Sequence, residues 1–431
     1  MSATLTSTPA PSLSGRNGEW QGLRSTPPLP SLVGKGPGLR SPRILMVTPR
    51  YYPLVGGTET HVAEVARRLV GRHGQRVTVL TTDLHGALPP LERGPEGAWV
   101  RRLRAYPAGG ALAELRYTPQ LGATILRERA GYDLLHLQGS FTLVAPAALR
   151  AARRAGLPYV VTFHSGGHSS RLRNLLRGAQ FAALRPFLAG ARRLIAVSRF
   201  EAAYFQARLR LPADRFTVVP NGVNLPDVAT TADDGPAAGT LLVSTGRLER
   251  FKGHQQAIAA LPHVLRSRPD ACLRIVGSGP YEPELRRLAA DLGVAGRVEI
   301  AAIAPEDRGG MTRLLRRAAL VIAFSEYESQ GIGVGEALAL GRKALVTDAT
   351  AFGELVAAGL AHGLPPQSGP QATASAILAA LDTPFPAPGS ISLPTWDDCA
   401  GQLAALYREI LHVLALSSAL SADTRAWPTA A

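Results

Sequence analysis

The sequence predicts an α/β protein with two doubly wound domains, each built on a parallel β-sheet with helices on both faces. The chain has 431 residues, which is too long for one ordinary hydrophobic core. Short apolar runs alternate with helix-like segments along most of it, and this order is typical of parallel sheets. A polar segment without apolar periodicity, residues 225–239, separates two such series. It is expected to be an interdomain linker.

The composition is that of a globular protein, with 46% apolar and 18% charged residues. Cys272 and Cys399 lie far apart and are predicted to be buried free thiols rather than a disulfide or a metal site. The sequence has no uninterrupted run of about 20 apolar residues, so a membrane-spanning helix is not expected. The N-terminus lacks the pattern of a signal peptide. We therefore expect a cytoplasmic protein, with a peripheral position at the inner face of the membrane as a second option.

The net charge of +15 would ordinarily favour a nucleic-acid or anionic-membrane partner. Only three lysines occur, however, at positions 35, 252 and 343, and an arginine excess of this kind is equally consistent with genome composition. The basic residues are scattered without interleaved aromatics, so we expect no nucleic-acid partner. One basic amphipathic stretch, residues 171–193, has the composition of a membrane-surface helix and equally that of an ordinary surface helix.

The N-terminal region divides into an extension and a first domain. Residues 1–40 are rich in Ser, Thr, Pro and Gly, and we expect them to be disordered. The first domain, residues 41–224, has apolar runs of the kind that buried parallel strands require. These runs lie at 43–48, 77–81, 99–103, 134–137, 159–163, 194–198 and 216–219, with helical patterns at 58–70, 117–130 and 142–155.

Candidate ligand contacts in this domain follow the carboxyl ends of strands, where parallel sheets bind ligands. Gly56 and Gly57 precede a helix, and such a pair allows close approach of the backbone to a ligand; a plain tight turn is the alternative. His164 ends a strand and is followed by Ser-Gly-Gly, although a lone histidine is more often structural. His136 and Ser140 are weaker candidates for lining the acceptor side.

The second domain, residues 240–394, shows the same alternation. Its apolar runs lie at 241–245, 273–276, 298–300, 319–324 and 344–347, with helical patterns near 254–267, 309–317 and 332–340. A last helix is predicted near 396–416, within a C-terminal segment of residues 395–431.

Two basic residues follow the first strand of this domain. Arg247 and Lys252 lie five residues apart on a loop, where a guanidinium fork and a point charge can converge on one diphosphate. The alternative is two solvated basic residues in an arginine-rich chain. Gly277 stands in the Gly-containing turn after the next strand.

Residues 325–341 read as a Gly-rich turn that leads from a strand into a helix. A helix start at Gly331 and Ile332 would point free N–H groups at an anion. Glu328 precedes this helix and Glu336 lies about one turn inside it. Carboxylates beside a diphosphate are suited to accept hydrogen bonds from sugar hydroxyls. A solvated pair of glutamates at a helix start is the alternative.

These motifs together resemble a known family. Glu328, seven residues and then Glu336-Ala337, with Gly331 between them, resemble the E-x7-E signature of the retaining glycosyltransferases of family 4, which have the GT-B fold. Further resemblances lie at Gly56-Gly57, the T-x-H strand end at His164, P-N-G-V at 220–223, G-R-x4-K-G at 246–253 and V-G-x-G-P at 276–280. Gln330 stands where the family more often has Phe, and Phe324 where it often has Pro, which bears on sugar preference more than on activity.

The resemblance implies two Rossmann-like domains facing a central cleft, with the last helix crossing back onto the first domain. It implies transfer of a sugar from a UDP- or GDP-sugar to an acceptor hydroxyl with retained configuration, without a metal or a further cofactor. By the same resemblance, Glu328 and His164 would position the sugar, and Glu336 would hold the ribose. The residues that would face the diphosphate are Arg247, Lys252, Gly331 and Ile332. Gly56 and Gly57 would lie beside the sugar and the diphosphate, and Gly277 near the nucleotide.

The sequence leaves alternatives open. A glycan phosphorylase or a nucleotide-sugar epimerase would share the fold. A basic protein that binds anionic surfaces, with a degenerate sugar site, is the alternative from another class. The expected partners are a nucleotide sugar and a sugar, lipid-linked or small-molecule acceptor, in glycan, glycolipid or cell-envelope polysaccharide synthesis. Donor base, donor sugar, acceptor and oligomeric state have no readable signal in the sequence.

Overall fold

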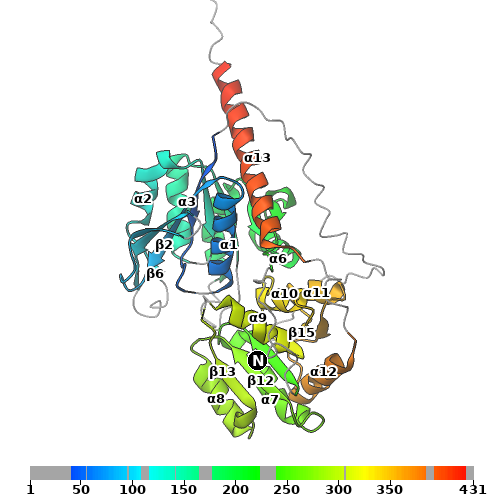
Figure 1. Cartoon of the computed structure of the whole chain (residues 1–431). Helices are drawn as coiled ribbons and strands as arrows, with labels where there is room; N and C mark the ends of the chain where they lie inside the picture. The colour runs from blue at the N-terminus through cyan, green and yellow to red at the C-terminus, as the bar shows by residue number, and fades with distance from the viewer. Residues whose placement is uncertain are drawn as a thin grey trace, which may run out of the picture.

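The computed structural model describes residues 40–54, 56–94, 97–107, 116–140, 142–164, 177–223, 239–304, 307–384 and 393–423. Two parallel sheets with helices on both faces form two bodies stacked end to end (Figure 1), which confirms the predicted α/β class. The predicted extension 1–40 and linker 225–239, except for one residue of each, lie outside the described residues.

The first sheet has the strand order β10-β9-β8-β7-β1-β2-β4-β3. All pairs are parallel except β3 with β4. The strands of the inner part are buried on both faces, which explains why they read as continuous apolar runs. The bounds are β1 Arg43–Val47, β2 Arg76–Asp83, β3 Leu91–Arg93, β4 Trp99–Arg104, β7 Leu134–Gln138, β8 Tyr159–Thr162, β9 Leu194–Ala196 and β10 Phe216–Val218, with a small hairpin of β5 Tyr106–Pro107 and β6 Arg116–Tyr117.

Helices cover both faces of this sheet. One face packs against α2 (Leu121–Glu128), α3 (Val144–Ala155), α5 (Arg177–Ala189) and α6 (Arg199–Leu209). The other face packs against α1 (Gly57–Gly71) and α13 (Trp396–Asp423). The helix predicted over 117–130 begins only at Leu121, because the chain turns at Pro119-Gln120 after β6.

The described part of the basic stretch 171–193 contains α5. Its apolar side chains Phe181, Leu184 and Leu188 are at most 5% exposed and belong to the core beneath the sheet. An apolar face already buried in the protein is not free to enter a bilayer, so residues 177–189 support the ordinary-helix interpretation. Residues 171–176 lie outside the described residues.

The second sheet has the order β13-β12-β11-β14-β15-β16 and is parallel throughout. The strands are β11 Leu241–Thr245, β12 Cys272–Val276, β13 Val298–Ala301, β14 Leu320–Ala323, β15 Ala344–Thr347 and β16 His362–Leu364. The helices are α7 His254–Val264, α8 Glu282–Asp291, α9 Arg308–Arg317, α10 Ile332–Ala339, α11 Phe352–Ala357 and α12 Pro370–Asp382.

The C-terminal helix α13 returns to the first body. Figure 1 shows it lying beside α1 and continuing past it. Trp396, Cys399 and Tyr407 are buried in the core that α13 shares with α1 and β1. Cys399 is a buried free thiol as predicted, while Cys272 is free and only partly buried. Among the described residues, no helix is both long and apolar enough to cross a bilayer.

The chain crosses between the bodies after Val223 and returns before Trp396. The two crossings touch, because the Val223 N–H donates to the Pro394 carbonyl at 3.1 Å. A side chain at Gly222 would overlap the backbone of Trp396.

Each sheet reverses its strand order beside its first strand. β1 lies between β7 and β2, and β11 lies between β12 and β14. Ligands of doubly wound sheets bind beyond the carboxyl ends of the strands at this reversal. The loops after β1 and β14 meet there across the two bodies, since a Cβ on Gly57 would lie 3.7 Å from Ile332 Cδ1.

Candidate active site

The loop after β1 brings Gly56 and Gly57 to the start of α1. A Cβ on Gly56 would lie 2.6 Å from Glu59 Oε2, and Glu59 is buried and paired with Arg50 at 2.8 Å. The carboxylate therefore occupies the space beside the Gly56 backbone. Gly57 opens α1 and faces Ile332, so both predicted glycines lie at the junction of the two bodies.

The start of α10 requires glycine. Gly331 has φ +78°, and a Cβ there would lie 2.2 Å from Cε1 of the buried Phe352. A Cβ on Gly333 would lie 2.4 Å from Thr245 Oγ1 at the end of β11. The glycines thus let the first turn of α10 sit directly on the strand end. Its leading N–H groups precede the first intrahelical bonds, from Val334 and Gly335 to the Gly331 carbonyl, as at helix starts that bind anions.

The two predicted basic residues lie near the same aromatic ring. Lys252 Nζ lies 2.7 Å from Glu328 Oε2, with less than a fifth of either side chain exposed. The Lys252 ammonium and the Arg247 guanidinium lie 5.6 and 6.0 Å from the centre of the same Phe251 ring. Arg247 is 45% exposed, with Glu249 at 3.6 Å. A lysine, an arginine and a carboxylate therefore gather beside the strand ends of the second sheet.

The loops after β11 and β12 are tied together beneath these groups. Gly277 touches the Gly246 carbonyl so closely that a Cβ would overlap it, and Gly246 N–H donates to the Val276 carbonyl at 3.0 Å. His254 also supports the loop, which the sequence did not indicate. Burial lowers the pKa of His254 to about 4, so the neutral ring can donate from Nε2 to the Arg247 carbonyl at 3.2 Å.

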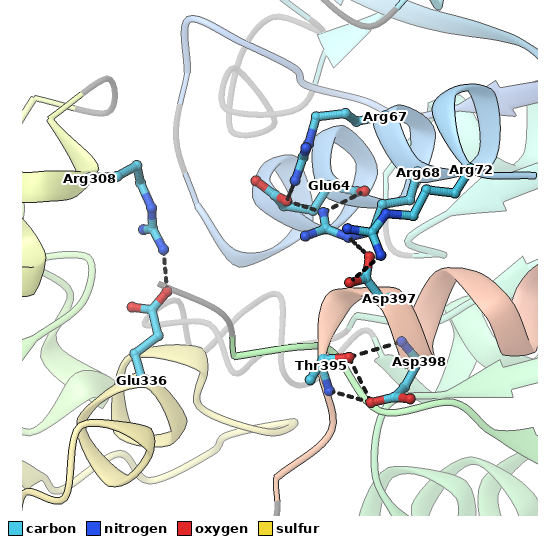
Figure 2. A network of polar contacts seen from close by, with 9 residues as sticks. All are labelled: Glu64, Arg67, Arg68, Arg72, Arg308, Glu336, Thr395, Asp397 and Asp398. Carbon is cyan, nitrogen blue, oxygen red and sulfur yellow. Dashed lines mark hydrogen bonds and ion pairs between the residues drawn. The ribbon is translucent and has the colours of Figure 1, made fainter. Parts of the chain in front are cut away.

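Glu336 projects from α10 and forms an ion pair with Arg308, the first residue of α9 (Figure 2). Burial raises the pKa of Glu336, and the Arg308 charge and hydrogen bond oppose this rise. Glu64 of α1, which pairs with Arg67 and lies across from them in Figure 2, adds a smaller raising effect. Sequence reasoning missed Arg308, because an arginine 28 positions away carries no local signal of this pairing.

His164 lies two residues after the end of β8 and has φ +45°, in a region that non-glycine residues rarely adopt. Its Nε2 lies 2.8 Å from Gln138 Oε1. The ring packs edge-on against His61 at 4.3 Å between centres. Burial lowers the pKa of His164 well below its usual range, and His61 and His136 lower it further. The ring is therefore neutral near pH 7.

His136 and Ser140 do not line an open site. His136 lies within β7, is fully buried, and bonds to Tyr407 and Thr162. Ser140 is 1% exposed. The weak prediction that they face an acceptor is wrong, because both side chains are buried: His136 lies within β7, a central strand covered on both sides, and Ser140 lies in the loop that follows it.

Two contacts join the bodies beside the site, and the sequence indicated neither. Gln330 accepts from the Asn221 N–H at 2.6 Å and donates to the Asn221 carbonyl at 3.0 Å. Glu354 accepts from the Phe200 N–H at 2.6 Å. The departure at Gln330 therefore serves the junction between the bodies.

Among the predicted site residues, the structure brings together Lys252 with Glu328, Gly57 with Ile332, and Gly277 with the loop of Arg247. Glu336 and His164 contact Arg308 and Gln138 instead. Within the described part of the chain, no cluster of three His, Cys, Asp or Glu side chains is arranged to hold a metal ion.

Models of known protein families match both bodies of the chain. Residues 55–226 match the model of Glycosyltransferase Family 4, and residues 239–383 match that of Glycosyl transferases group 1. The chain belongs to glycosyltransferase family 4. This confirms the resemblance predicted from the two glutamates and the basic loop.

The glycosyltransferase has curated relatives that span most of its length. Phosphatidyl-myo-inositol mannosyltransferase of Mycobacterium tuberculosis is 31% identical over 353 residues, which cover 79% of this chain and 86% of the relative. D-inositol 3-phosphate glycosyltransferase of Acidothermus cellulolyticus is 30% identical over 338 residues, which cover 69% and 73%.

Solved structures agree on the fold of this glycosyltransferase. Sucrose-phosphate synthase from Thermosynechococcus elongatus matches with a TM-score of 0.70 at 20% identity, covering 87% of this chain and 100% of that one. Anabaena Alr3699/HepE, in complex with UDP and glucose, matches with a TM-score of 0.62 at 19% identity, covering 88% and 99%. The fold is GT-B, as predicted.

Proposed function

We propose that this glycosyltransferase moves a sugar from a nucleoside diphosphate sugar to an acceptor hydroxyl and keeps the anomeric configuration. The observation that carries the proposal is the place of Lys252 and Arg247 on one loop at the strand ends of the second sheet, with Lys252 paired to Glu328, three residues before the α10 start at Gly331. Two cations and a helix N-terminus are the groups that would neutralise a departing diphosphate. Protein groups would supply this charge without a metal ion.

The carboxylates have separate tasks in this proposal. Glu328 forms an ion pair with Lys252, and a bound diphosphate would draw on the same ammonium, which frees Glu328 to accept a hydrogen bond from the sugar. Glu336 would accept hydrogen bonds from the ribose. Arg308 opposes the rise that burial causes in the pKa of Glu336 and so favours the ionised carboxylate, which is the form that only accepts.

The proposed reaction exchanges one bond at the anomeric carbon of the sugar for another. The bond from sugar C1 to the diphosphate oxygen breaks, the acceptor oxygen bonds to C1, and the acceptor proton leaves with the diphosphate or passes to water. The leaving group gains negative charge as the bond breaks. Preorganised donors aimed at that charge lower the barrier more than any other single effect, which is the role assigned here to Arg247, Lys252 and the α10 start.

We propose a polyol acceptor and place inositol compounds first. The two curated relatives are named for D-inositol 3-phosphate and phosphatidyl-myo-inositol. A free inositol phosphate would need no membrane contact, whereas a phosphatidylinositol would place the enzyme at a membrane surface. Comparing the two as acceptors, with the same donor, separates these cases.

The test begins with nucleotide binding. Calorimetry of UDP, GDP, ADP and dTDP in a chelating buffer identifies the base and shows whether a metal is needed. Lys252→Met is expected to weaken binding by about 10- to 100-fold, because a hydrogen bond to a charged group is lost. Lys343→Met is the matched control, since Lys343 contacts the Leu381 carbonyl away from these strand ends.

The product analysis separates the alternatives. NMR of the new glycosidic bond reports whether the configuration is kept. Sugar phosphate formation from a glycan and phosphate would indicate a phosphorylase, and free nucleotide with an epimerised sugar would indicate an epimerase. Salt-sensitive binding to vesicles or polyanions, with no nucleotide bound and no effect of Lys252→Met, would overturn the proposal in favour of a basic surface-binding protein.

A further inference from the structure

We infer that Gln138 is a positioning residue that fixes the tautomer of His164, with the proton on Nε2, and thereby leaves Nδ1 as a hydrogen-bond acceptor for a hydroxyl of the transferred sugar. The inference rests on the proposed function. It adds a chain of contacts that runs from His164 through Gln138 and His136 to Tyr407 of the C-terminal helix.

The first step is the bond between His164 and Gln138. The Gln138 amide oxygen lies 2.8 Å from His164 Nε2, and an amide oxygen can only accept. His164 Nε2 must therefore carry the proton and donate it. Gln138 is the last residue of β7 and fully buried, so its amide is held by the sheet rather than by solvent.

The imidazole ring of His164 is neutral. His164 packs against His61, and His61 Nδ1 must donate to Asn221 Oδ1 at 2.7 Å because that oxygen only accepts. Burial lowers the pKa of His61 to about 4 and that of His164 well below its usual range. A neutral imidazole with its proton on Nε2 has a bare lone pair on Nδ1.

The contact at the far end of Gln138 agrees with this orientation of the amide. The other end of Gln138, Nε2, lies 3.1 Å from His136 Nδ1, and an amide N–H needs an acceptor. His136 is neutral in its buried position and can offer a ring lone pair. Its two nitrogens lie 2.5 Å from the Tyr407 hydroxyl and 2.7 Å from Thr162 Oγ1, so His136 is held by β8 and α13 together.

The backbone of His164 shows that this orientation is imposed. A non-glycine side chain at φ +45° is strained relative to ordinary backbone, and such outliers persist where the surroundings hold them, often at functional sites. The bond to Gln138 holds the ring in that position. Docking of α13 through Tyr407 completes the support, which links the C-terminal helix to the sugar-binding end of the first sheet.

The first test reads the tautomer directly. Long-range ¹H–¹⁵N spectra of the full chain with labelled histidine, with the His164 signals assigned by their loss in His164→Asn, report which nitrogen is protonated. The proton is expected on Nε2 in the wild type, and the preference is expected to disappear in Gln138→Met. A wild-type ring protonated on Nδ1 overturns the inference.

The second test uses turnover, with UDP-glucose and GDP-mannose as donor probes. Gln138→Met is expected to lower kcat/KM by about 10- to 100-fold, the loss that one misplaced hydrogen bond to the reacting sugar produces, while the affinity for the nucleoside diphosphate stays as in the wild type. In Gln138→Glu the carboxylate can still accept the hydrogen bond from His164 Nε2–H. This variant is therefore expected to lose less kcat/KM than Gln138→Met. Equal turnover in Gln138→Met and wild type overturns the inference.

The third test concerns the far end of the chain of contacts. Tyr407→Phe keeps the ring of α13 but removes the hydroxyl beside His136, and we expect a smaller fall in kcat/KM of about threefold to tenfold. Tyr159→Phe is the matched control, because its buried hydroxyl donates to the Phe187 carbonyl at 2.7 Å outside this chain. Equal effects of the two changes would overturn the part assigned to α13.

These outcomes are distinguishable from failure of the proposed function. If no nucleotide binds the wild type, the proposed function fails, whatever the His164 tautomer. If nucleotides bind and sugar is transferred but Gln138→Met behaves as the wild type, only the inference about Gln138 fails.

Discussion

Replacing Gly331 by alanine tests how α10 is held at the site. Two costs add at this position. Alanine at φ +78° costs roughly 1–2 kcal/mol in backbone strain. Its Cβ would also lie 2.2 Å from Phe352 Cε1, well inside the roughly 3.5–4.0 Å of an ordinary carbon contact. Forcing an extra methyl into such packing costs about 1–3 kcal/mol more, because Phe352 is fully buried and cannot swing away.

Gly359 provides the matched control. It has φ +70°, and a Cβ there would meet no atom within 4 Å, so Gly359→Ala carries only the backbone strain. We expect Gly331→Ala to lower the free energy of unfolding by about 2–5 kcal/mol and Gly359→Ala by about 1–2 kcal/mol. Urea unfolding followed by fluorescence measures both, through the shift in midpoint.

Gly331→Ala should also weaken nucleotide binding. Relieving the clash displaces the first turn of α10, whose N–H groups are proposed to face the diphosphate, so UDP or GDP should bind at least about tenfold more weakly. Gly359→Ala should bind as the wild type does. Equal urea midpoints for the two variants, together with wild-type nucleotide affinity in Gly331→Ala, would refute both the packing argument and the assigned anion site.

Three further outcomes are expected. Arg308→Ala removes the cation that opposes the effect of burial on Glu336, so the pKa of Glu336 should rise further. As the pH falls, Glu336 should then be protonated, and nucleotide binding weakened, at a higher pH than in the wild type. Calorimetry between about pH 5 and 8 measures this shift, and an unchanged pH midpoint of binding would contradict it. Gln330→Met leaves the buried backbone groups of Asn221 unpaired and should cost about 1–3 kcal/mol, with faster hydrogen exchange at the Asn221 amide; unaltered exchange would argue against the contact. Trp396→Ala should cost about 3–5 kcal/mol in thermal or urea unfolding, whereas Val413→Ala, at an exposed position of the same helix, should cost under about 0.5 kcal/mol.

The sheets were predictable because their inner strands are buried on both faces. A strand such as β1 or β14 has no polar side, so it appears in the sequence as an apolar run. The edge strands β3 and β16 give no such signal, although the edge strands β10 and β13 were predicted from their apolar runs. β3 exposes half of Leu91 and β16 has three residues, and neither stands out from a loop. The boundaries of α2 and α7 differ from prediction by a few residues for the same reason, since turns and helix ends share their composition.

The candidate site was readable in the sequence where its residues are neighbours in the chain. Gly331 and the pair Arg247 and Lys252 each lie within one loop, so their spacing suggested an anion site, which stays a prediction. Arg308 with Glu336 and Gln330 with Asn221 are contacts between segments 28 and 109 residues apart. Such pairs depend on how two strand ends are placed in space, and single residues carry no mark of their partners.

The double crossing at Val223 and Pro394 places the entry to and the exit from the second body side by side, because one backbone hydrogen bond joins the outgoing and returning segments. The bodies also touch through the hydrogen bonds of Gln330 with Asn221 and of Glu354 with Phe200, and where Gly57 meets Ile332. A change in the relative orientation of the bodies would therefore have to break these contacts, whereas the paired crossing segments could stay joined.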